Sequence, residues 1–256
     1  MKRTIIFRGS VIFDRHPDNF LKESIEVLRN WFDGEVIVST WKNQKEHVKN
    51  IKNIDKIILT DDPGPGPIQQ LNRQIISYEA GLNEASNDLV MVTRTDFIHK
   101  KDIFHHLNDN PLQQNQFKIF KKKLLIGNMM SIDPSSQEVP NTFRLSDWFQ
   151  IGLREDIENW GRIKNTISNM DLSNSGCTEK IWMTAVLKKN NYKNISPSDT
   201  SEIDKNFWDI VVNNFIIKNT KSTLHSYNMN WINQPEDLYC YISEELYNQK
   251  YNNILT

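Results

Sequence analysis

Four short apolar segments in the first part of the chain each end in residues that could contact a phosphate group or a metal ion. The plainest case is VTRTDFIH, Val92–His99, in which the apolar run Leu89–Val92 leads into Arg94 and Asp96. An aspartate offers the oxygen ligands that Mg²⁺ and Mn²⁺ prefer, and a guanidinium matches phosphate oxygens in a two-point contact. The alternative is a solvated Arg–Asp pair at a strand end, which contributes little to stability.

The other three segments end in the same manner. They are Ile5–Phe7 followed by Arg8 and Gly9, Val36–Val38 followed by Ser39 and Thr40, and Lys56–Leu59 followed by Asp61 and Asp62. Asp62 precedes Pro63 and Gly64, so a plain turn explains this aspartate as well as a contact with a base or a ribose does. Arg73 stands in the next helical segment and could reach a diphosphate at the same place.

Two acidic residues in the second half are candidates for acid–base chemistry. Asp147 precedes Trp148 and Phe149, whose rings could shield the carboxylate from water and raise its pKa. Glu179 follows a glycine-containing loop and opens a helical segment, which is a common way to present a base. Both positions are equally typical of ordinary structure, because aspartate is frequent in turns and acids favour the first turn of a helix.

The apolar segments alternate with stretches of helical periodicity. Helical spacing is present over Phe20–Phe32 and Ile68–Leu82, and residues 41–55 predict a short helix or an irregular crossover. Short strands that are apolar throughout suit a sheet covered on both faces, and their alternation with helices predicts parallel βαβ units. Ligands bind beyond the carboxyl ends of such strands, so the four polar strand ends should meet at one edge of the sheet.

The second half predicts a less regular arrangement. Strands are expected at Leu124–Ile126 and Met129–Ile132, and a loop or turn leading into a strand at Phe143–Gly152. A helix is expected over Glu179–Leu187 with Thr178 as its N-cap, and residues 207–217 and 238–251 have helical or mixed character. No repeat or low-complexity linker divides the sequence, so a single domain over residues 1–256 is predicted.

The composition argues against several classes of protein. A net charge of −1 produces no overall field toward nucleic acid, and the densest basic run, Lys121–Lys123, predicts a turn or a solvated face. Two cysteines, Cys177 and Cys240, are too few for a disulfide framework or a metal cluster and favour a reducing compartment. Neither a signal-peptide core nor an apolar run of membrane length is present, so a cytoplasmic protein is expected.

Several of these motifs occur in a specific order. They are Ile37–Trp41, Asp61–Gly64, Asn72–Gln74 with Ala80–Leu82, Arg94–Asp96, and Ser146–Gly152. Together, over roughly residues 4 to 190, they resemble the WavE lipopolysaccharide-synthesis family of bacterial surface-polysaccharide enzymes. The resemblance implies a GT-A-like α/β fold, a nucleotide-binding sandwich with a mostly parallel central sheet flanked by helices and a helical C-terminal part. On this basis residues 1–100 form the nucleotide-binding half and residues 101–256 the acceptor-binding half.

The resemblance also implies a reaction, the transfer of a sugar from a nucleotide-sugar donor to a glycan acceptor of lipopolysaccharide or capsule. The residues expected to bind the donor are Arg8, Gly9, Thr40, Asp62, Arg73, Arg94 and Asp96. Glu179 is the preferred general base and Asp147 a ligand of the acceptor or of the donor sugar, although the two roles could be reversed. The reaction is expected in the cytoplasm or at the inner face of the membrane, with at most peripheral membrane association.

The metal requirement is open at this point. Arg94-Thr95-Asp96 stands where GT-A enzymes carry their DxD motif, and Arg94 replaces the first aspartate. Asp96 could bind Mn²⁺ or Mg²⁺ alone or together with His225, or Arg94 could supply the positive charge that the departing phosphate needs.

Two other functions remain open on the sequence. A nucleotidyltransferase or polyol-phosphate transferase could use the same fold and the same strand-end aspartate, but only Gly9 stands where a glycine-rich basic loop would be typical. A non-catalytic glycan-assembly or glycan-binding protein is the other alternative, and it rests on the missing first aspartate.

Overall fold

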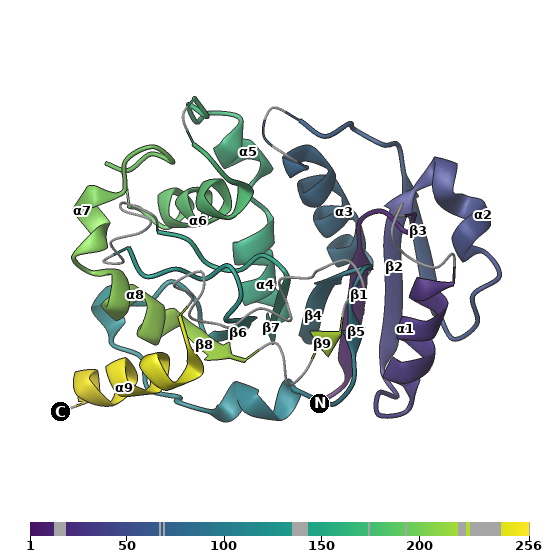
Figure 1. Cartoon of the computed structure of the whole chain (residues 1–256), viewed down its shortest axis with the longest axis horizontal. Coiled ribbons are helices and arrows are strands. Elements are labelled where there is room, and N and C mark those ends of the chain that lie inside the picture. The colour runs from purple at the N-terminus through teal and green to yellow at the C-terminus, as the bar shows by residue number, and fades with distance from the viewer. Residues whose placement is uncertain are drawn as a thin grey trace.

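A seven-stranded sheet lies at the centre of the chain with helices packed on it (Figure 1). The computed structural model describes residues 1–12, 19–66, 68, 70–134, 143–173, 175–192, 194–219, 224–225 and 242–255. The strands of this sheet are β1 (Arg3–Arg8), β2 (Glu35–Trp41), β3 (Lys56–Thr60), β4 (Leu89–Arg94), β6 (Leu124–Gly127), β7 (Phe149–Leu153) and β8 (Phe215–Lys218). Their order is β3-β2-β1-β4-β7-β6-β8, and β7 is the one strand of the sheet that runs antiparallel to its neighbours. A separate pair joins β5 (Ile98–His99) to β9 (Leu224–His225).

The helices follow the strands along the chain. They are α1 (Phe20–Arg29), α2 (Lys45–Val48), α3 (Leu71–Asn83), α4 (Arg154–Gly161), α5 (Lys164–Ile167), α6 (Thr178–Lys189), α7 (Ser201–Asp204), α8 (Phe207–Asn214) and α9 (Glu244–Leu255), with 3₁₀ turns at Lys42–Gln44, Phe104–Asn108 and Asn115–Phe117. Within the described residues, no helix combines the length and the apolar character that crossing a membrane requires.

The two faces of the sheet carry separate hydrophobic cores, because successive side chains of a strand point to opposite faces. On β1, Ile6 belongs to the core that contains residues of α3, α4, α6, α8 and α9, whereas Ile5 and Phe7 belong to the core that contains residues of α1. Figure 1 shows α3 on one side of β1 and β2, and α1 and α2 on the other. β1, β2 and β4 are therefore covered on both faces, as their apolar sequences predict, whereas β3 at the edge of the sheet is only half-buried.

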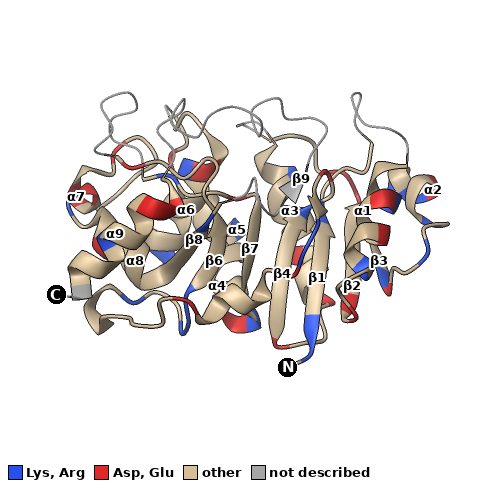
Figure 2. Cartoon of the chain, turned by 60° about the horizontal axis from the view of Figure 1, so that its bottom comes forward, with Lys and Arg blue, Asp and Glu red and all other residues tan. Residues whose placement is uncertain are grey.

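The register of the parallel strands brings two arginines together. Arg8 at the end of β1 lies opposite Ser39 of β2 on one side and opposite Arg94 of β4 on the other. Figure 2 shows β1 and β4 side by side in the middle of the sheet. Alternation places Arg8 on the same face as Ile6, and Arg94 on the same face as Val92, so both guanidinium groups lie on the side of α3 and α6.

The predicted α/β class with a mostly parallel sheet, flanking helices and a helical C-terminal part is confirmed. The four predicted strands of the first half and the strand at Leu124–Ile126 are all present. The sheet takes β1 to β4 from residues 1–100 and β6 to β8 from residues 101–256, so the two halves share one sheet. The binding roles assigned to the two halves stay a prediction.

The predicted strand at Met129–Ile132 is wrong. The chain turns after β6, and Met130 adopts a positive φ of 66°, which a strand does not allow. Ile132 alone of this segment makes a β-bridge, to Arg144. The apolar residues are buried because the turn folds them against the core, not because they extend along the sheet.

Two smaller predictions also need correction. Lys121 and Lys122 are exposed as expected of a solvated turn, but Lys123 is buried, with its Nζ atom 4.5 Å from the centre of the Tyr251 ring. Burial lowers the pKa of Lys123 to about 8. Thr178 is the first residue of α6, and Cys177, whose thiol is free, stands at the N-cap position. Cys240 lies outside the described residues.

We predict that Gly81→Ala destabilises the protein. A Cβ atom at Gly81 of α3 would lie 2.5 Å from Cγ2 of Ile6 and 3.2 Å from Cβ of Ser39, so the helix would have to move away from β1 and β2. Overpacking of this kind costs about 1–3 kcal/mol, more than the gain in helix propensity. Urea unfolding of the variant measures the loss, and Asn83→Ala, at an exposed position of the same helix, is the control. An unchanged or higher midpoint for Gly81→Ala would contradict the prediction.

Candidate functional site

A cavity of ≈ 360 Å³ lies at the carboxyl ends of β1 and β4. Its lining comes from β1 and the residues after it, from Trp41, from α3 and the residue before it, and from the end of β4 with the two residues that follow. The lining contains five of the seven residues predicted to bind the donor: Arg8, Gly9, Arg73, Arg94 and Asp96. The expectation that polar strand ends meet at one edge is thus confirmed for β1 and β4.

Gly9 allows the chain to turn at this edge. Its φ of +108° lies in a region that L side chains rarely adopt, and its N–H donates to the carbonyl of Ser39 at 3.0 Å. Residues after Gly9 therefore leave the plane of the sheet and contribute to the wall of the cavity.

Arg94 and Asp96 form a two-point ion pair in the cavity. Nε and Nη2 of Arg94 donate to the two carboxylate oxygens of Asp96 at 2.9 and 2.7 Å. The Asp96 side chain is 2% exposed and the Arg94 side chain 28% exposed, so the carboxylate lies behind the guanidinium. The arginine is the member of the pair that a ligand in the cavity would meet.

Arg73, on α3, makes a similar two-point contact with an aspartate. Its Nε and Nη2 donate to the carboxylate oxygens of Asp62 at 2.7 and 2.6 Å, and its Nη1 donates to Oε1 of Gln70 at 2.9 Å. Asp62 also accepts a hydrogen bond from the N–H of Gly64 at 3.0 Å, which shapes the loop after β3. Asp62 is therefore placed beside the cavity through Arg73 and does not line it.

Arg8 connects the cavity to a second group of charges. Its guanidinium is almost fully buried, lies 5.6 Å from the ring centre of Tyr78 and 5.9 Å from that of Trp182, and donates from Nη2 to the carbonyl of Asp147 at 2.7 Å. The same Nη2 lies 3.8 Å from the carboxylate of Asp147. Burial lowers the pKa of Arg8, and the negative charge of Asp147 opposes this effect.

Asp147 and Glu179 are buried and interact electrostatically. Burial raises the pKa of Glu179 most, the charge of Asp147 raises it further, and the guanidinium of Arg144 counteracts the rise. Nη2 of Arg144 lies 3.8 Å from Oε2 of Glu179. Within the described residues, Oδ2 of Asp147 and Oε2 of Glu179 accept no hydrogen bond, and neither residue is among those that line the cavity.

Arg144 is a residue of this group that sequence reasoning did not identify. The bridge between Ile132 and Arg144 fixes its backbone, and its Nη2 contacts Sδ of Met130 at 3.5 Å. Its position three residues before Asp147 was the one sign in the sequence that Arg144 could belong to the site. The segment has no helical or strand periodicity that would have shown which way its side chain points. Tyr78 and Trp182, which flank Arg8, were also missed because both look like ordinary core residues in sequence.

Two predicted residues have other surroundings. Thr40 follows the odd–even alternation of β2 to the face opposite Arg8, and its hydroxyl donates to Oε1 of Gln44 at 2.9 Å. The backbone of His225 pairs with Ile98 in the β5–β9 pair, and the side chain of His225 lies outside the described part of the chain. Thr40 is not among the residues that line the cavity, and both roles stay predictions.

The residues present do not fit a divalent cation at Asp96. Both oxygens of this carboxylate accept hydrogen bonds from Arg94, whose positive charge would repel a metal ion at the same place. Across the residues that the structure describes, no three His, Cys, Asp or Glu side chains gather as a metal-binding group. Binding of Mn²⁺ or Mg²⁺ would require Arg94 to leave Asp96.

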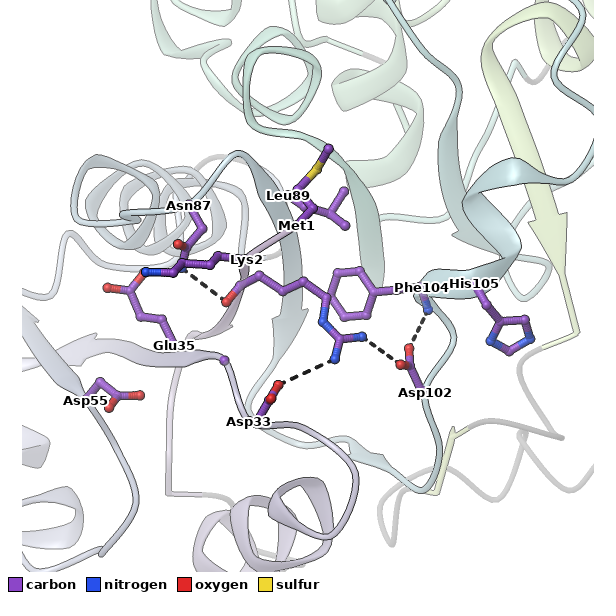
Figure 3. Close-up of a pocket in the computed structure, with 12 residues that line it drawn as sticks. Met1, Lys2, Asp33, Glu35, Asp55, Asn87, Leu89, Asp102, Phe104 and His105 are labelled. Carbon is purple, nitrogen blue, oxygen red and sulfur yellow. Dashed lines mark hydrogen bonds and ion pairs between the residues drawn. The ribbon is translucent and has the colours of Figure 1, made fainter.

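A larger cavity, of ≈ 990 Å³, lies at the amino-terminal edge of the sheet (Figure 3). Figure 3 shows Asp33 and Asp102 in this cavity, and both pair with Arg3, at 3.6 and 2.6 Å. The rings of Phe32 and Phe104 lie 5.3 and 5.1 Å from the same guanidinium. These contacts satisfy the charges locally, and the position is opposite to the edge where ligands of parallel sheets bind.

The family of the chain follows from a comparison with known families. A model of the WavE lipopolysaccharide synthesis family matches residues 4–224. The chain belongs to this family. The matched range spans both halves of the sheet and includes every predicted site residue except His225. A comparison with curated protein sequences found no match.

Three solved structures share part of the WavE chain's arrangement. HddC from Yersinia pseudotuberculosis has a TM-score of 0.40 and 12% identity, over 62% of this chain and 80% of that one. The glycosyltransferase GlyE of Streptococcus pneumoniae TIGR4 has a TM-score of 0.41 and 12% identity, over 86% and 46% of the two chains. An active-site mutant of LgtC has a TM-score of 0.41 and 9% identity, over 86% and 74%. These likenesses are distant.

We predict that Glu179→Gln stabilises the protein at high pH. The pKa of the Glu179 carboxyl is higher in the folded state than in the unfolded state. The carboxyl therefore contributes stability below its ordinary pKa, and this contribution is lost as the pH rises through the raised pKa of the folded state. A neutral glutamine avoids this loss, so the unfolding temperature should rise more at pH 8 than at pH 5, by roughly 2–4 °C for each kcal/mol relieved. Thermal unfolding at both values measures the difference, with the exposed Glu245→Gln as control. Equal shifts at both pH values would contradict the prediction.

Proposed function

We propose that this WavE-family protein is a GT-A-type glycosyltransferase that transfers a sugar from a nucleotide-sugar donor to a lipopolysaccharide or capsule acceptor. One observation carries the proposal. The arginine-lined cavity at the carboxyl ends of β1 and β4 is joined, through the buried Arg8, to Asp147, whose charge acts on the buried carboxyl group of Glu179. A diphosphate site beside a buried acid pair is the arrangement that sugar transfer from a nucleotide donor needs. Membership of a lipopolysaccharide synthesis family supports the choice of acceptor.

The cavity supplies positive charge for the leaving group. When the bond between the anomeric carbon and the donor phosphate breaks, the departing nucleoside diphosphate gains negative charge. Arg94 and Arg73 line the cavity with planar guanidinium groups, which match phosphate oxygens in two-point contacts. Arg8 lies beside Arg94 in the β1–β4 pair, also lines the cavity, and adds a third positive charge.

Glu179 is the proposed general base. In an inverting reaction the acceptor hydroxyl oxygen forms the new bond to the anomeric carbon, and a carboxylate takes the hydroxyl proton. A base works best when its pKa lies near the working pH, and burial together with Asp147 moves the pKa of Glu179 in that direction. Asp147, held beside Arg8, is the proposed ligand of a sugar hydroxyl, and its Oδ2 accepts no hydrogen bond from a described residue.

The direct test of the function is release of nucleotide from a panel of UDP-, GDP-, CDP- and CMP-sugars, with and without oligosaccharide acceptors from bacterial surface polysaccharide. The wild-type chain is expected to turn over one class of donor. Glu179→Gln should lower kcat by about 10²–10⁴-fold with little change in donor affinity. Failure of the folded wild-type protein to release nucleotide from any donor would favour a non-catalytic binding role.

We predict that Arg144 acts on the reaction through Glu179. Removing its guanidinium, 3.8 Å from Oε2 of Glu179, should raise the pKa of the carboxyl further. The acidic limb of the kcat/KM–pH profile should therefore move upward by roughly one unit in Arg144→Gln. Arg144→Lys, which keeps the charge, should stay nearer the wild-type profile. An Arg144→Gln variant that loses activity equally at all pH values would show that the residue is only structural.

A further inference from the structure

The two arginines that line the cavity are held in the same manner. Each one donates from Nε and Nη2 to both oxygens of an aspartate, Arg94 to Asp96 at 2.9 and 2.7 Å and Arg73 to Asp62 at 2.7 and 2.6 Å. Long side chains that are fixed before a ligand arrives lose less conformational freedom on binding. The aspartates thus orient two guanidinium groups that line one cavity.

We propose that these two Arg–Asp pairs form a metal-independent binding site for the diphosphate of a nucleoside diphosphate. The proposal deepens the proposed function and rests on it, since it names what holds the donor. The guanidinium groups of Arg94 and Arg73 take the place that a metal ion bound by two aspartates would occupy.

The two pairs differ in how firmly the carboxylate is held. Asp96 is 2% exposed and lies behind Arg94, so it stays in place while the Nη1 side of Arg94, which bonds to no described residue, meets the ligand. The Asp62 side chain is 24% exposed on the loop after β3, so a phosphate can replace it at Arg73. Asp96 therefore positions its arginine, whereas Asp62 competes with the ligand for its arginine.

This difference predicts opposite effects for two matched substitutions. Asp96→Asn removes the charge that orients Arg94 and should weaken diphosphate binding. Asp62→Asn removes a competitor for Arg73 and should leave binding unchanged or make it tighter. If Asp62 instead bound the ligand directly, both substitutions would weaken binding, and the assignment of Asp62 as a competitor would be overturned.

The experiment is calorimetric titration of the full chain with UDP, GDP and CDP, in EDTA and again in Mn²⁺. One nucleotide is expected to bind with the same Kd in both solutions, within about twofold. Arg94→Met and Arg73→Met should each weaken binding by about tenfold or more, because a charge-assisted hydrogen bond contributes that much. Arg94→Lys should also weaken it, since an ammonium keeps the charge but not the two-point geometry.

The matched control is Arg29→Met. Arg29 also pairs with an aspartate, Asp55, at 2.8 Å, but it lies at the amino-terminal edge of the sheet and should not affect nucleotide binding. Thermal unfolding of each variant confirms that it is folded. The metal-independent site would be overturned if a nucleotide bound only when Mn²⁺ is present, or if binding survived both methionine substitutions. Either result would leave the transferase function standing. Binding of none of the three nucleoside diphosphates in either solution would instead overturn this inference together with the proposal that the donor is one of their sugars.

Discussion

The site depends on placing two arginines side by side at the ends of neighbouring parallel strands. The register of β1 and β4 puts Arg8 opposite Arg94 on one face of the sheet, and Arg8 is almost fully buried, so water screens their repulsion poorly. Each guanidinium therefore needs its own compensation. Asp96 provides it for Arg94, while Asp147 and the rings of two aromatic residues provide it for Arg8. The requirement to balance these charges links the cavity to the acid pair.

The charges in the site are not fully compensated by hydrogen bonds. Nε of Arg8, Nε of Arg144, Oδ2 of Asp147 and Oε2 of Glu179 are buried and make no hydrogen bond among the described residues. Each unsatisfied group of this kind costs about 1–3 kcal/mol, and more when it is charged. A stable fold tolerates such a cluster where a bound ligand supplies the missing hydrogen bonds. For the same reason, the free protein is expected to lose stability at Glu179.

How much the sequence could predict depended on periodicity. Apolar runs and their polar ends located β1 to β4 and placed Arg8 and Arg94 at one edge, and alternation along β2 would have sent Thr40 to the other face. Irregular backbone carries no such signal. The turn at Met130 was therefore predicted as a strand. Arg144 contacts Met130 in this turn, and its part in the site could not be recognised from the sequence. Asp147 and Glu179 are far apart in the sequence, and only the tertiary fold brings them close enough to interact, so no local sequence pattern marks them as a pair.

The most direct measurement of the central claim is a crystal structure of the chain grown with the nucleoside diphosphate that binds, in the presence of EDTA. The account predicts the two phosphates in the cavity at the ends of β1 and β4, with their oxygens within hydrogen-bond distance of Arg94 and Arg73, and Asp96 still paired with Arg94. A nucleotide bound elsewhere on the chain, or phosphates that contact neither arginine, would contradict it.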